Sequence, residues 1–288
     1  MLKYNRFFPN LLPDYHLSGG LTGIAFLYFG VDILKNPNPL KQLLKEGKPA
    51  LGGWITLEGA LKTEVFAKGG FDWMTIDLQH GALTLESARP LITAIEASGS
   101  SPLVRVPWNE PSIIMRALDA GAYGIIVPLV NSAEEAAAAV SAMKYPPEGI
   151  RSSGPWRAGI SGVQNYQSWI NNELVLMVMI ETKQAVENVD AILSVPGIDG
   201  VYVGPSDLSL AYGLSPAPDQ TDKEWNAALD SILAACKKYN VVPGIAGNAK
   251  VAVKRLSQGF RFLEVSRDTT VLERGAREDV ELLKSNMS

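Results

Sequence analysis

The segment PGIDGVYV at residues 196–203 contains the pattern that decides the fold. A glycine stands where a helix would end, one polar residue follows within a few positions, and a short β-rich apolar run comes next. Three other segments repeat this pattern, at residues 69–76, 120–127 and 258–265. A glycine at a helix C-terminus can adopt the left-handed conformation that ends a helix before a strand. The apolar runs are short and continuous, as is typical of parallel strands covered on both faces.

Four further apolar runs bring the predicted strands to eight. They lie at residues 50–56, 102–106, 174–180 and 241–245. Amphipathic helical patterns separate the strands, at residues 57–68, 84–97, 110–120, 133–143, 185–193, 223–239 and 249–258. Strands that alternate with helices in this number predict an α/β fold, a (β/α)8 TIM barrel in a single domain. An open doubly wound sheet is the alternative, but no G-x-G-x-x-G or Walker loop supports nucleotide binding.

The chain of 288 residues divides into an extension and one domain. Residues 1–38 fit no part of the barrel pattern and are expected to form an N-terminal extension of uncertain structure. Residues 39–288 are expected to form the barrel domain, which ends in a charged C-terminal helix. The apolar stretch 19–34 contains Asp32 and is too short for a membrane span. It resembles the apolar part of a signal peptide but lacks a clean cleavage site, so a cytoplasmic protein without a membrane partner is expected.

Composition excludes several classes of function. A net charge of −4 lacks the basic footprint that nucleic acid binding requires. The single cysteine, Cys236, excludes an intrachain disulfide and lies on the apolar stripe of the predicted helix 223–239, which indicates a core thiol. Two histidines, His16 and His80, exclude a His-rich metal centre. A divalent metal would therefore rest mainly on carboxylates, which favours Mg²⁺, Mn²⁺ or a similar hard ion.

Ionisable residues follow four of the predicted strands. Barrel active sites lie at the C-terminal ends of the strands, so these side chains are expected to converge on one rim. Asp77 or Asp207 alone would be explained as a helix cap. Glu181 is harder to explain as a structural residue, because a carboxylate directly after a buried strand needs a cation or a pair. The candidates are Asp77, His80, Arg105, Glu181 and the segment 204–207.

At these residues the chain resembles the HpcH/HpaI aldolase family, the metal-dependent class II pyruvate aldolases that include 4-hydroxy-2-oxoheptanedioate aldolase. Together the matching phrases are specific, and they run in family order over residues 39–283. They are DWMTIDLQHG (72–81), VRVPWN (104–109), YPPEGIR (145–151), IET (180–182) and VGPSDLS (203–209). The resemblance implies a TIM barrel, a divalent metal cofactor (Mg, Mn or Co), and a 2-oxo acid and an aldehyde as small-molecule partners.

The resemblance also implies the metal ligands and one substrate ligand. Glu181 and Asp207 match the two metal-binding carboxylates, and Asp207 also belongs to the substrate-binding set. Arg105 matches the arginine that holds the keto acid and stabilises the enolate. An arginine suits this role because it is always cationic and binds carboxylates in fixed geometry.

Further site residues are implied in the same way. His80, oriented by Asp77, matches the base of the site, and an unperturbed histidine can accept a proton near neutral pH. Asp119 matches an acid that reaches the histidine of a neighbouring subunit. Ser206, with Gly204 beside it, matches a position where a backbone N–H contacts the substrate carboxylate. The family further implies a homo-oligomer, a hexamer or trimer of dimers, that exchanges C-terminal helices between neighbours.

Two residues depart from the family pattern. Many members have Glu where this chain has Gln79, and many have Gln where it has Met179, which removes a polar contact near metal and substrate. These two departures therefore bear on the substrate preference more than on the type of reaction. Trp156, Arg157 and Tyr123 are candidates to line the pocket for the aldehyde.

Other chemistries remain as alternatives. An oxaloacetate decarboxylase similar to macrophomate synthase, or a citryl-CoA type lyase, would use the same scaffold, and CoA would require a basic groove such as the Arg151 and Arg157 region. A Schiff-base mechanism would need a lysine at the rim, where Lys183 is the best placed. A phosphate-binding isomerase would use the glycine-rich turn at residues 244–248.

Overall fold

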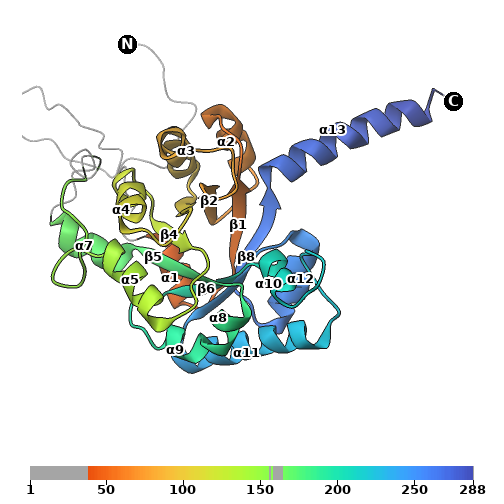
Figure 1. Ribbon diagram of the computed structural model, residues 1–288. Coiled ribbons are helices and arrows are strands. Elements are labelled where there is room, and N and C mark those ends of the chain that lie inside the picture. The colour runs from red at the N-terminus through yellow and green to blue at the C-terminus, as the bar shows by residue number, and fades with distance from the viewer. Residues whose placement is uncertain (1–37, 156, 158–164, 288) are drawn as a thin grey trace, which may run out of the picture. The chain divides into compact units, whose positions relative to one another are not determined.

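The computed structural model describes residues 38–155, 157 and 165–287, and Figure 1 shows their arrangement. Each strand pairs in parallel with the next, and the last closes on the first. The predicted (β/α)8 barrel is confirmed, and the doubly wound alternative is wrong. The strands are β1 (Ala50–Ile55), β2 (Trp73–Asp77), β3 (Ser101–Arg105), β4 (Gly124–Val127), β5 (Val175–Ile180), β6 (Gly200–Val203), β7 (Val242–Ile245) and β8 (Phe262–Arg267).

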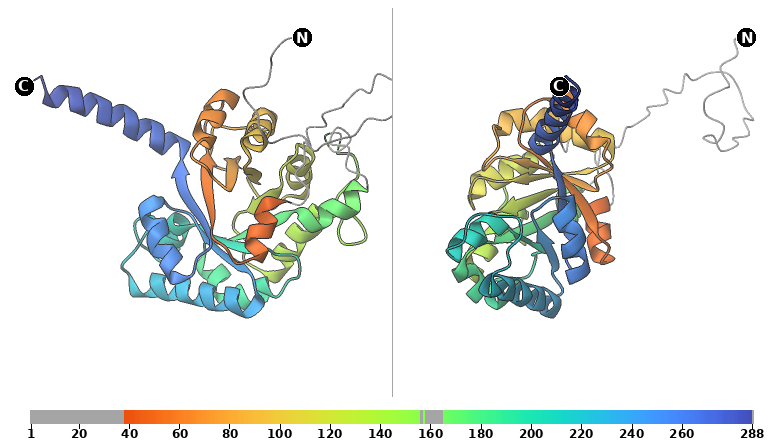
Figure 2. Two further views of the ribbon diagram at one scale, coloured as in Figure 1. Left: turned by 180° about the vertical axis from the view of Figure 1, so that it is seen from behind. Right: turned by 90° about the vertical axis from the view of Figure 1, so that its right-hand side faces the viewer.

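Helices surround the barrel, as two further views show (Figure 2). The predicted helix 185–193 is two short helices, because Asn188 ends the first and begins the second. The helices are α1 (Pro39–Lys45), α2 (Ala60–Ala67), α3 (Leu85–Ser98), α4 (Pro111–Asp119), α5 (Ala133–Met143), α7 (Tyr166–Glu173), α8 (Lys183–Glu187), α9 (Val189–Leu193), α10 (Pro205–Ala211), α11 (Lys223–Tyr239), α12 (Ala249–Gln258) and α13 (Asp268–Ser285).

The repeated glycine pattern has the predicted backbone conformation. One glycine in each of the four segments has a positive φ angle, namely Gly70, Gly121, Gly197 and Gly259. A residue with a Cβ adopts this region rarely, so glycine lets the chain leave the helix and turn into the next strand. The same local chemistry therefore produces four of the barrel's helix-to-strand turns.

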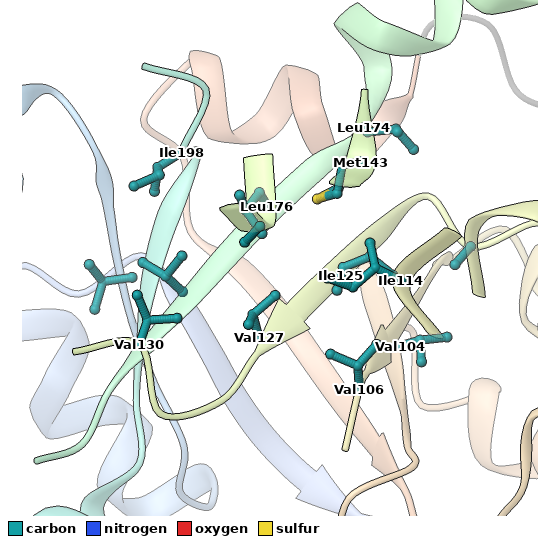
Figure 3. Close-up of a cluster of buried hydrophobic side chains, with 14 of the residues drawn as sticks. Val104, Val106, Ile114, Ile125, Val127, Val130, Met143, Leu174, Leu176 and Ile198 are labelled. Atoms are coloured by element: carbon teal, nitrogen blue, oxygen red, sulfur yellow. The ribbon is translucent and has the colours of Figure 1, made fainter. Parts of the chain in front are cut away.

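Apolar side chains between the strands and the outer helices form the larger core. Figure 3 shows part of it, where Val104 of β3 and Ile125 of β4 lie with Ile114 of α4. Leu176 of β5 and Met143 of α5 extend the same cluster. Burial of this layer fixes the outer helices on the barrel, and the helices in turn fix the loops that follow each strand.

Aromatic rings fill the inside of the barrel. Trp73 stacks on Phe262 with a centroid distance of 3.9 Å, and Trp54 stacks on Tyr202 at 5.5 Å. Leu40 of α1 is fully buried in the same cluster, so α1 closes the N-terminal end of the barrel. The interior is a packed core, and the open end lies at the C-terminal ends of the strands.

Helix α13 begins at Asp268, whose carboxylate is buried against β1. Beyond this anchor the helix leaves the barrel (Figure 1), and its Leu272, Val280 and Leu283 side chains are more than half exposed. Across the described residues, no helix combines the length and the apolar character that a bilayer span demands.

Candidate active site

A cavity of about 690 Å³ opens at the C-terminal ends of the strands. It collects four of the predicted site residues, His80, Arg105, Ser206 and Asp207, together with Gly204. Residues that the sequence did not indicate complete its walls, namely Trp54, Tyr202, Lys250, Glu264, Arg267 and Arg274. Much of the predicted rim therefore faces one space, whereas the buried Asp77 and Glu181 are not among the residues that line it.

Arg105 is fixed in this cavity by Asp77. The Arg105 Nε atom donates to Asp77 Oδ1 at 2.9 Å, and Nη2 donates to Oδ2 at 2.5 Å. Burial alone would raise the pKa of the Asp77 carboxyl, but the ion pair with Arg105 outweighs it and the pKa is lowered. The register of β2 and β3 pairs residue 77 with residue 105, so the barrel itself creates this contact. A two-point ion pair leaves the guanidinium little freedom to turn.

The expected role of Asp77 in orienting His80 needs correction. The Asp77 carboxylate accepts hydrogen bonds from the Trp54 indole at 3.1 Å and from the backbone N–H groups of Gln79 and His80. Asp77 therefore shapes the loop that carries His80 rather than binding its imidazole. The imidazole itself is exposed at the mouth of the cavity.

Glu181 lies at the end of β5 with a nearly buried side chain, 2% exposed. Its Oε1 atom accepts a hydrogen bond from the backbone N–H of Leu129 at 2.9 Å. Burial, and to a smaller extent the nearby Asp207 carboxylate, raise the Glu181 pKa to about 7, against this hydrogen bond and the Arg105 cation. Leu129 adopts a left-handed conformation with φ 52°, which is uncommon for a leucine and typical of strained functional loops.

The Glu181 and Asp207 carboxylates suit a hard divalent cation. Two carboxylates close enough to raise the pKa of one of them are stable together when a cation lies between them. Gly204 provides the space, because a Cβ at this position would lie 2.1 Å from Glu181 Oε2. Among the described residues, no three His, Cys, Asp or Glu side chains form a metal cluster. Two carboxylates would leave the remaining positions to substrate and water, as in many Mg²⁺ sites.

Asp119 lies apart from the cavity within one chain. It stands at the C-terminal end of α4, opposite to the strand ends that carry the other site residues. The buried Arg151 guanidinium donates to Asp119 Oδ1 at 2.7 Å. A role for Asp119 in catalysis thus depends on a neighbouring subunit.

Two of the three predicted aldehyde-pocket residues, Tyr123 and Arg157, do not line the cavity. Tyr123 is buried in the outer core, and Arg157 forms an ion pair with Glu96 on the α3 side of the barrel. Trp156 lies outside the described residues. The suggested basic groove for CoA, Arg151 with Arg157, therefore has no place at this site.

The lysines near the barrel rim, including the predicted Lys183, do not suit a Schiff base. Lys62 is paired with Asp268 at 2.6 Å, and Lys183 lies over the Tyr212 ring at 4.7 Å. Lys250 lines the cavity but is exposed, in contrast to the desolvated lysines that form Schiff bases.

Sequence reasoning missed Glu264 and Arg267 on β8. Glu264 is 1% exposed and lines the cavity, and Arg267 follows it three residues later. The signal was present, since a carboxylate inside an otherwise apolar run of a barrel strand must face a partner or a site.

Comparisons with known proteins agree with this geometry. A sequence model of the HpcH/HpaI aldolase/citrate lyase family matches residues 51–274. The hydroxypyruvate/pyruvate aldolase of Rhizorhabdus wittichii is 40% identical over 245 residues, which are 84% of this chain and 96% of that protein. The 4-hydroxy-2-oxo-heptane-1,7-dioate aldolase of Salmonella heidelberg is 38% identical over 243 residues, covering 83% of this chain and 92% of that protein.

A solved structure gives the same result. An HpcH/HpaI aldolase/citrate lyase family protein from Burkholderia cenocepacia superposes with a TM-score of 0.80 at 31% identity, covering 86% of this chain and 99% of that one. The family consists of enzymes that make or break carbon–carbon bonds, so this chain is a carbon–carbon lyase. The match extends over most of the barrel, and the chain belongs to the HpcH/HpaI aldolase/citrate lyase family.

Proposed function

We propose that the enzyme is a metal-dependent aldolase that cleaves and forms a carbon–carbon bond between pyruvate and an aldehyde, acting on 4-hydroxy-2-oxo acids. The observation that carries the proposal is the grouping of Asp207 and the fixed cation Arg105 on one cavity, with the buried Glu181 carboxylate close enough to both for each to shift its pKa. Cleavage next to a ketone leaves an enolate, whose charge must be stabilised as it forms.

Glu181 and Asp207 would hold the divalent metal. The donor set is compatible with Mg²⁺, Mn²⁺ or Co²⁺. When bound, the metal supplies Lewis-acid stabilisation of the 2-keto oxygen of the substrate. Leu129 and Gly204 set the position of the Glu181 carboxylate. The Leu129 N–H donates a hydrogen bond to it, and Gly204 leaves it space because it has no Cβ.

Arg105 binds an oxygen of the keto acid. Its Nε and Nη2 atoms are engaged by Asp77, so Nη1 is available to the substrate in a fixed direction. Ser206 and Gly204 lie at the start of α10, where a backbone N–H can donate to the substrate carboxylate. These groups orient pyruvate and require no movement during the reaction.

His80 accepts the hydroxyl proton as the carbon–carbon bond breaks, directly or through a water molecule. It lies at the mouth of the cavity, on a loop whose backbone is held by Asp77. We place the Asp119 carboxylate of a neighbouring subunit beside this imidazole, because Asp119 is partly exposed and cannot serve the site of its own chain.

We further propose a homo-oligomer, a hexamer built as a trimer of dimers, in which α13 is exchanged between copies. Leu272, Val280 and Leu283 form an exposed apolar stripe at helical spacing on α13. An apolar groove of about 550 Å³, lined in part by Leu61 and Val65 of α2 and by Leu272 of the same chain, offers a surface for the Val280 and Leu283 side chains of a neighbouring copy. Light scattering of a Val280→Asp, Leu283→Asp variant tests the exchange, because a variant that stays fully assembled would contradict it.

The location of the enzyme and its domain boundaries complete the proposal. We assign residues 39–288 to the aldolase domain, residues 1–38 to an extension, and the enzyme to the cytoplasm. A cytoplasmic site fits a carbon–carbon lyase that acts on small 2-oxo acids. Cell fractionation with an antibody against the barrel tests the location.

Proton exchange of pyruvate tests the central proposal. The methyl protons should exchange with D₂O in a metal-dependent reaction, followed by NMR after EDTA treatment and again after Mn²⁺ is added back. Glu181→Gln should bind Mn²⁺ weakly and lose exchange while keeping its circular dichroism spectrum. Exchange that persists without metal would contradict the metal assignment. Absence of exchange in the wild type, with rapid loss of oxaloacetate, would instead indicate a decarboxylase on the same scaffold.

A further inference from the structure

A second carboxylate–guanidinium pair lies in the active-site cavity. Glu264 Oε1 accepts hydrogen bonds from Arg267 Nη2 at 3.0 Å and from Nε at 3.2 Å. Glu264 Oε2 accepts a hydrogen bond from the hydroxyl of Tyr202 at 2.9 Å. The Glu264 side chain is 1% exposed, whereas that of Arg267 is 40% exposed. The carboxylate is thus buried and the guanidinium reaches the open space.

The second pair repeats the design of the first. The Arg105 guanidinium carbon lies 4.9 Å from the centroid of the Trp54 ring, and that of Arg267 lies 5.8 Å from it. In each arginine Nε and Nη2 bind a buried carboxylate, Asp77 in one case and Glu264 in the other. Each pair leaves Nη1 for another acceptor. Two cations that are held in fixed positions therefore lie near one tryptophan ring within one cavity.

The fold itself does not explain the pair. Arg267 stands at the N-cap of α13 but its side chain makes no capping hydrogen bond. A carboxylate on the inner face of a barrel strand carries a desolvation cost that an apolar residue at the same position would avoid. Burial raises the pKa of Glu264, although Arg267 and Tyr202 act against the shift. The arrangement is consistent with a carboxylate that serves to orient a guanidinium.

We propose that Arg267 determines acceptor specificity by binding a carboxylate on the aldehyde, with Glu264 and Tyr202 as its positioning residues. The inference rests on the proposed aldolase function, in which Arg105 serves the pyruvate half. The preferred aldehydes would be short and would carry their own carboxylate, so that the aldol product is a diacid. A monoanion fits better than a dianionic phosphate, because Glu264 already neutralises part of the charge of Arg267.

Competition between two aldehydes of similar length tests the proposal. The kcat/KM for addition of pyruvate is measured with succinic semialdehyde, which carries a carboxylate, and with neutral butanal. A hydrogen bond to a charged group contributes about 1.5–3 kcal/mol, so Arg267→Met should lower the ratio of the two values by about tenfold to a hundredfold. Arg267→Lys should recover part of the ratio, because it keeps the charge without the planar fork.

Arg267→Met leaves Glu264 buried without its cation. If that variant unfolds, Glu264→Gln with Arg267→Met replaces it, because the double variant removes both charges and keeps a hydrogen-bond acceptor for Tyr202. The double variant should show the same fall in the ratio. Arg274→Met is the matched control, since it removes an exposed cation from the same cavity. An equal fall in Arg274→Met would assign the effect to general charge and overturn the proposal.

The remaining outcomes also decide the question. An unchanged ratio in the double variant, or an equal loss for both aldehydes, would overturn the role of Arg267 in specificity. Deuterium exchange of pyruvate, measured in the wild type without any aldehyde, reports the proposed aldolase function separately. If exchange occurs and the ratio does not respond, only the acceptor assignment fails.

Discussion

Gly204 and Glu181 are in such close contact that residue 204 cannot carry a side chain. A Cβ built on Gly204 would lie 2.1 Å from Glu181 Oε2 and 3.1 Å from the Met179 side chain. The glycine begins α10, with an ordinary negative φ, so its backbone conformation does not require a glycine. Space for the carboxylate is therefore the reason for glycine at this position.

Substitution of this glycine should weaken metal binding. Gly204→Ala should push the Glu181 carboxylate away from its position and lower Mn²⁺ affinity by about tenfold to a hundredfold, the usual effect of disturbing the surroundings of a ligand. Titration of Mn²⁺ followed by electron paramagnetic resonance measures the affinity. Gly154→Ala, at an exposed position where an added Cβ meets no atom within 4 Å, is the control for a general glycine effect. Unchanged Mn²⁺ affinity in Gly204→Ala would show that Glu181 is not a ligand.

Asp77→Asn should reduce turnover without removing the metal. The amide cannot accept both Arg105 hydrogen bonds, so the guanidinium loses its fixed direction, and misplacement of a catalytic group costs about a hundredfold in rate. The rate of pyruvate exchange should fall accordingly while Mn²⁺ affinity stays near that of the wild type. Asp72→Asn, at the other end of β2, is the matched control. Wild-type exchange in Asp77→Asn would contradict the positioning role.

Asp268 should stabilise the barrel in a pH-dependent way. Burial raises the pKa of this carboxyl, but Lys62 and Thr56 outweigh burial and the net pKa is lowered. A lowered folded-state pKa stabilises the fold above the unfolded value of about 3.9 and loses this contribution as the pH falls toward the folded value. The difference in Tm between the wild type and Asp268→Asn should therefore be largest near neutral pH and shrink on acidification. A difference that grows on acidification would contradict the assignment.

Cys236 should be unreactive in the folded enzyme. Burial raises the pKa of its thiol to about 12, and the side chain is 1% exposed on α11. Near neutral pH a chromogenic disulfide reagent should label the native chain only on the timescale of unfolding, and should label one thiol per chain in concentrated guanidinium. Rapid labelling of the native enzyme would show that α11 opens locally.

Local sequence pattern predicted most of the barrel. The apolar period over residues 223–239 matches α11 in full, and the glycine-led runs coincide with β2, β4, β6 and β8 within one or two residues. Helix α1 was not predicted, because Leu40 and Leu44 are buried only through packing on the end of the closed barrel, which a local pattern does not show. Asn188, at the break between α8 and α9, donates a hydrogen bond to the backbone of Asn131, 57 residues away, a contact that no local period records.

The site could be predicted where an ionisable residue directly follows a strand. It could not be predicted where a contact depends on the pairing register of two neighbouring strands. His80, Arg105, Ser206 and Asp207 meet in one cavity as expected. The partner of Asp77 could not be read from the sequence, because only pairing of β2 with β3 brings residue 105 beside residue 77. Tyr123 and Arg157 were wrongly expected at the aldehyde pocket, since loop residues carry no sign of the face to which they turn.

The closed lower end of the barrel has a kinetic consequence. The rings of Trp73 and Phe262 and the side chain of Leu40 fill the barrel interior. In the described part of the chain, the active-site cavity is therefore closed at the N-terminal end of the strands. Glu181 and Arg105 are buried, while the Arg267 side chain is 40% exposed. In a cavity with one opening, the substrate that binds first is the last to leave. The 2-oxo acid should therefore enter before the aldehyde in synthesis and depart after it in cleavage, which makes the reaction compulsorily ordered.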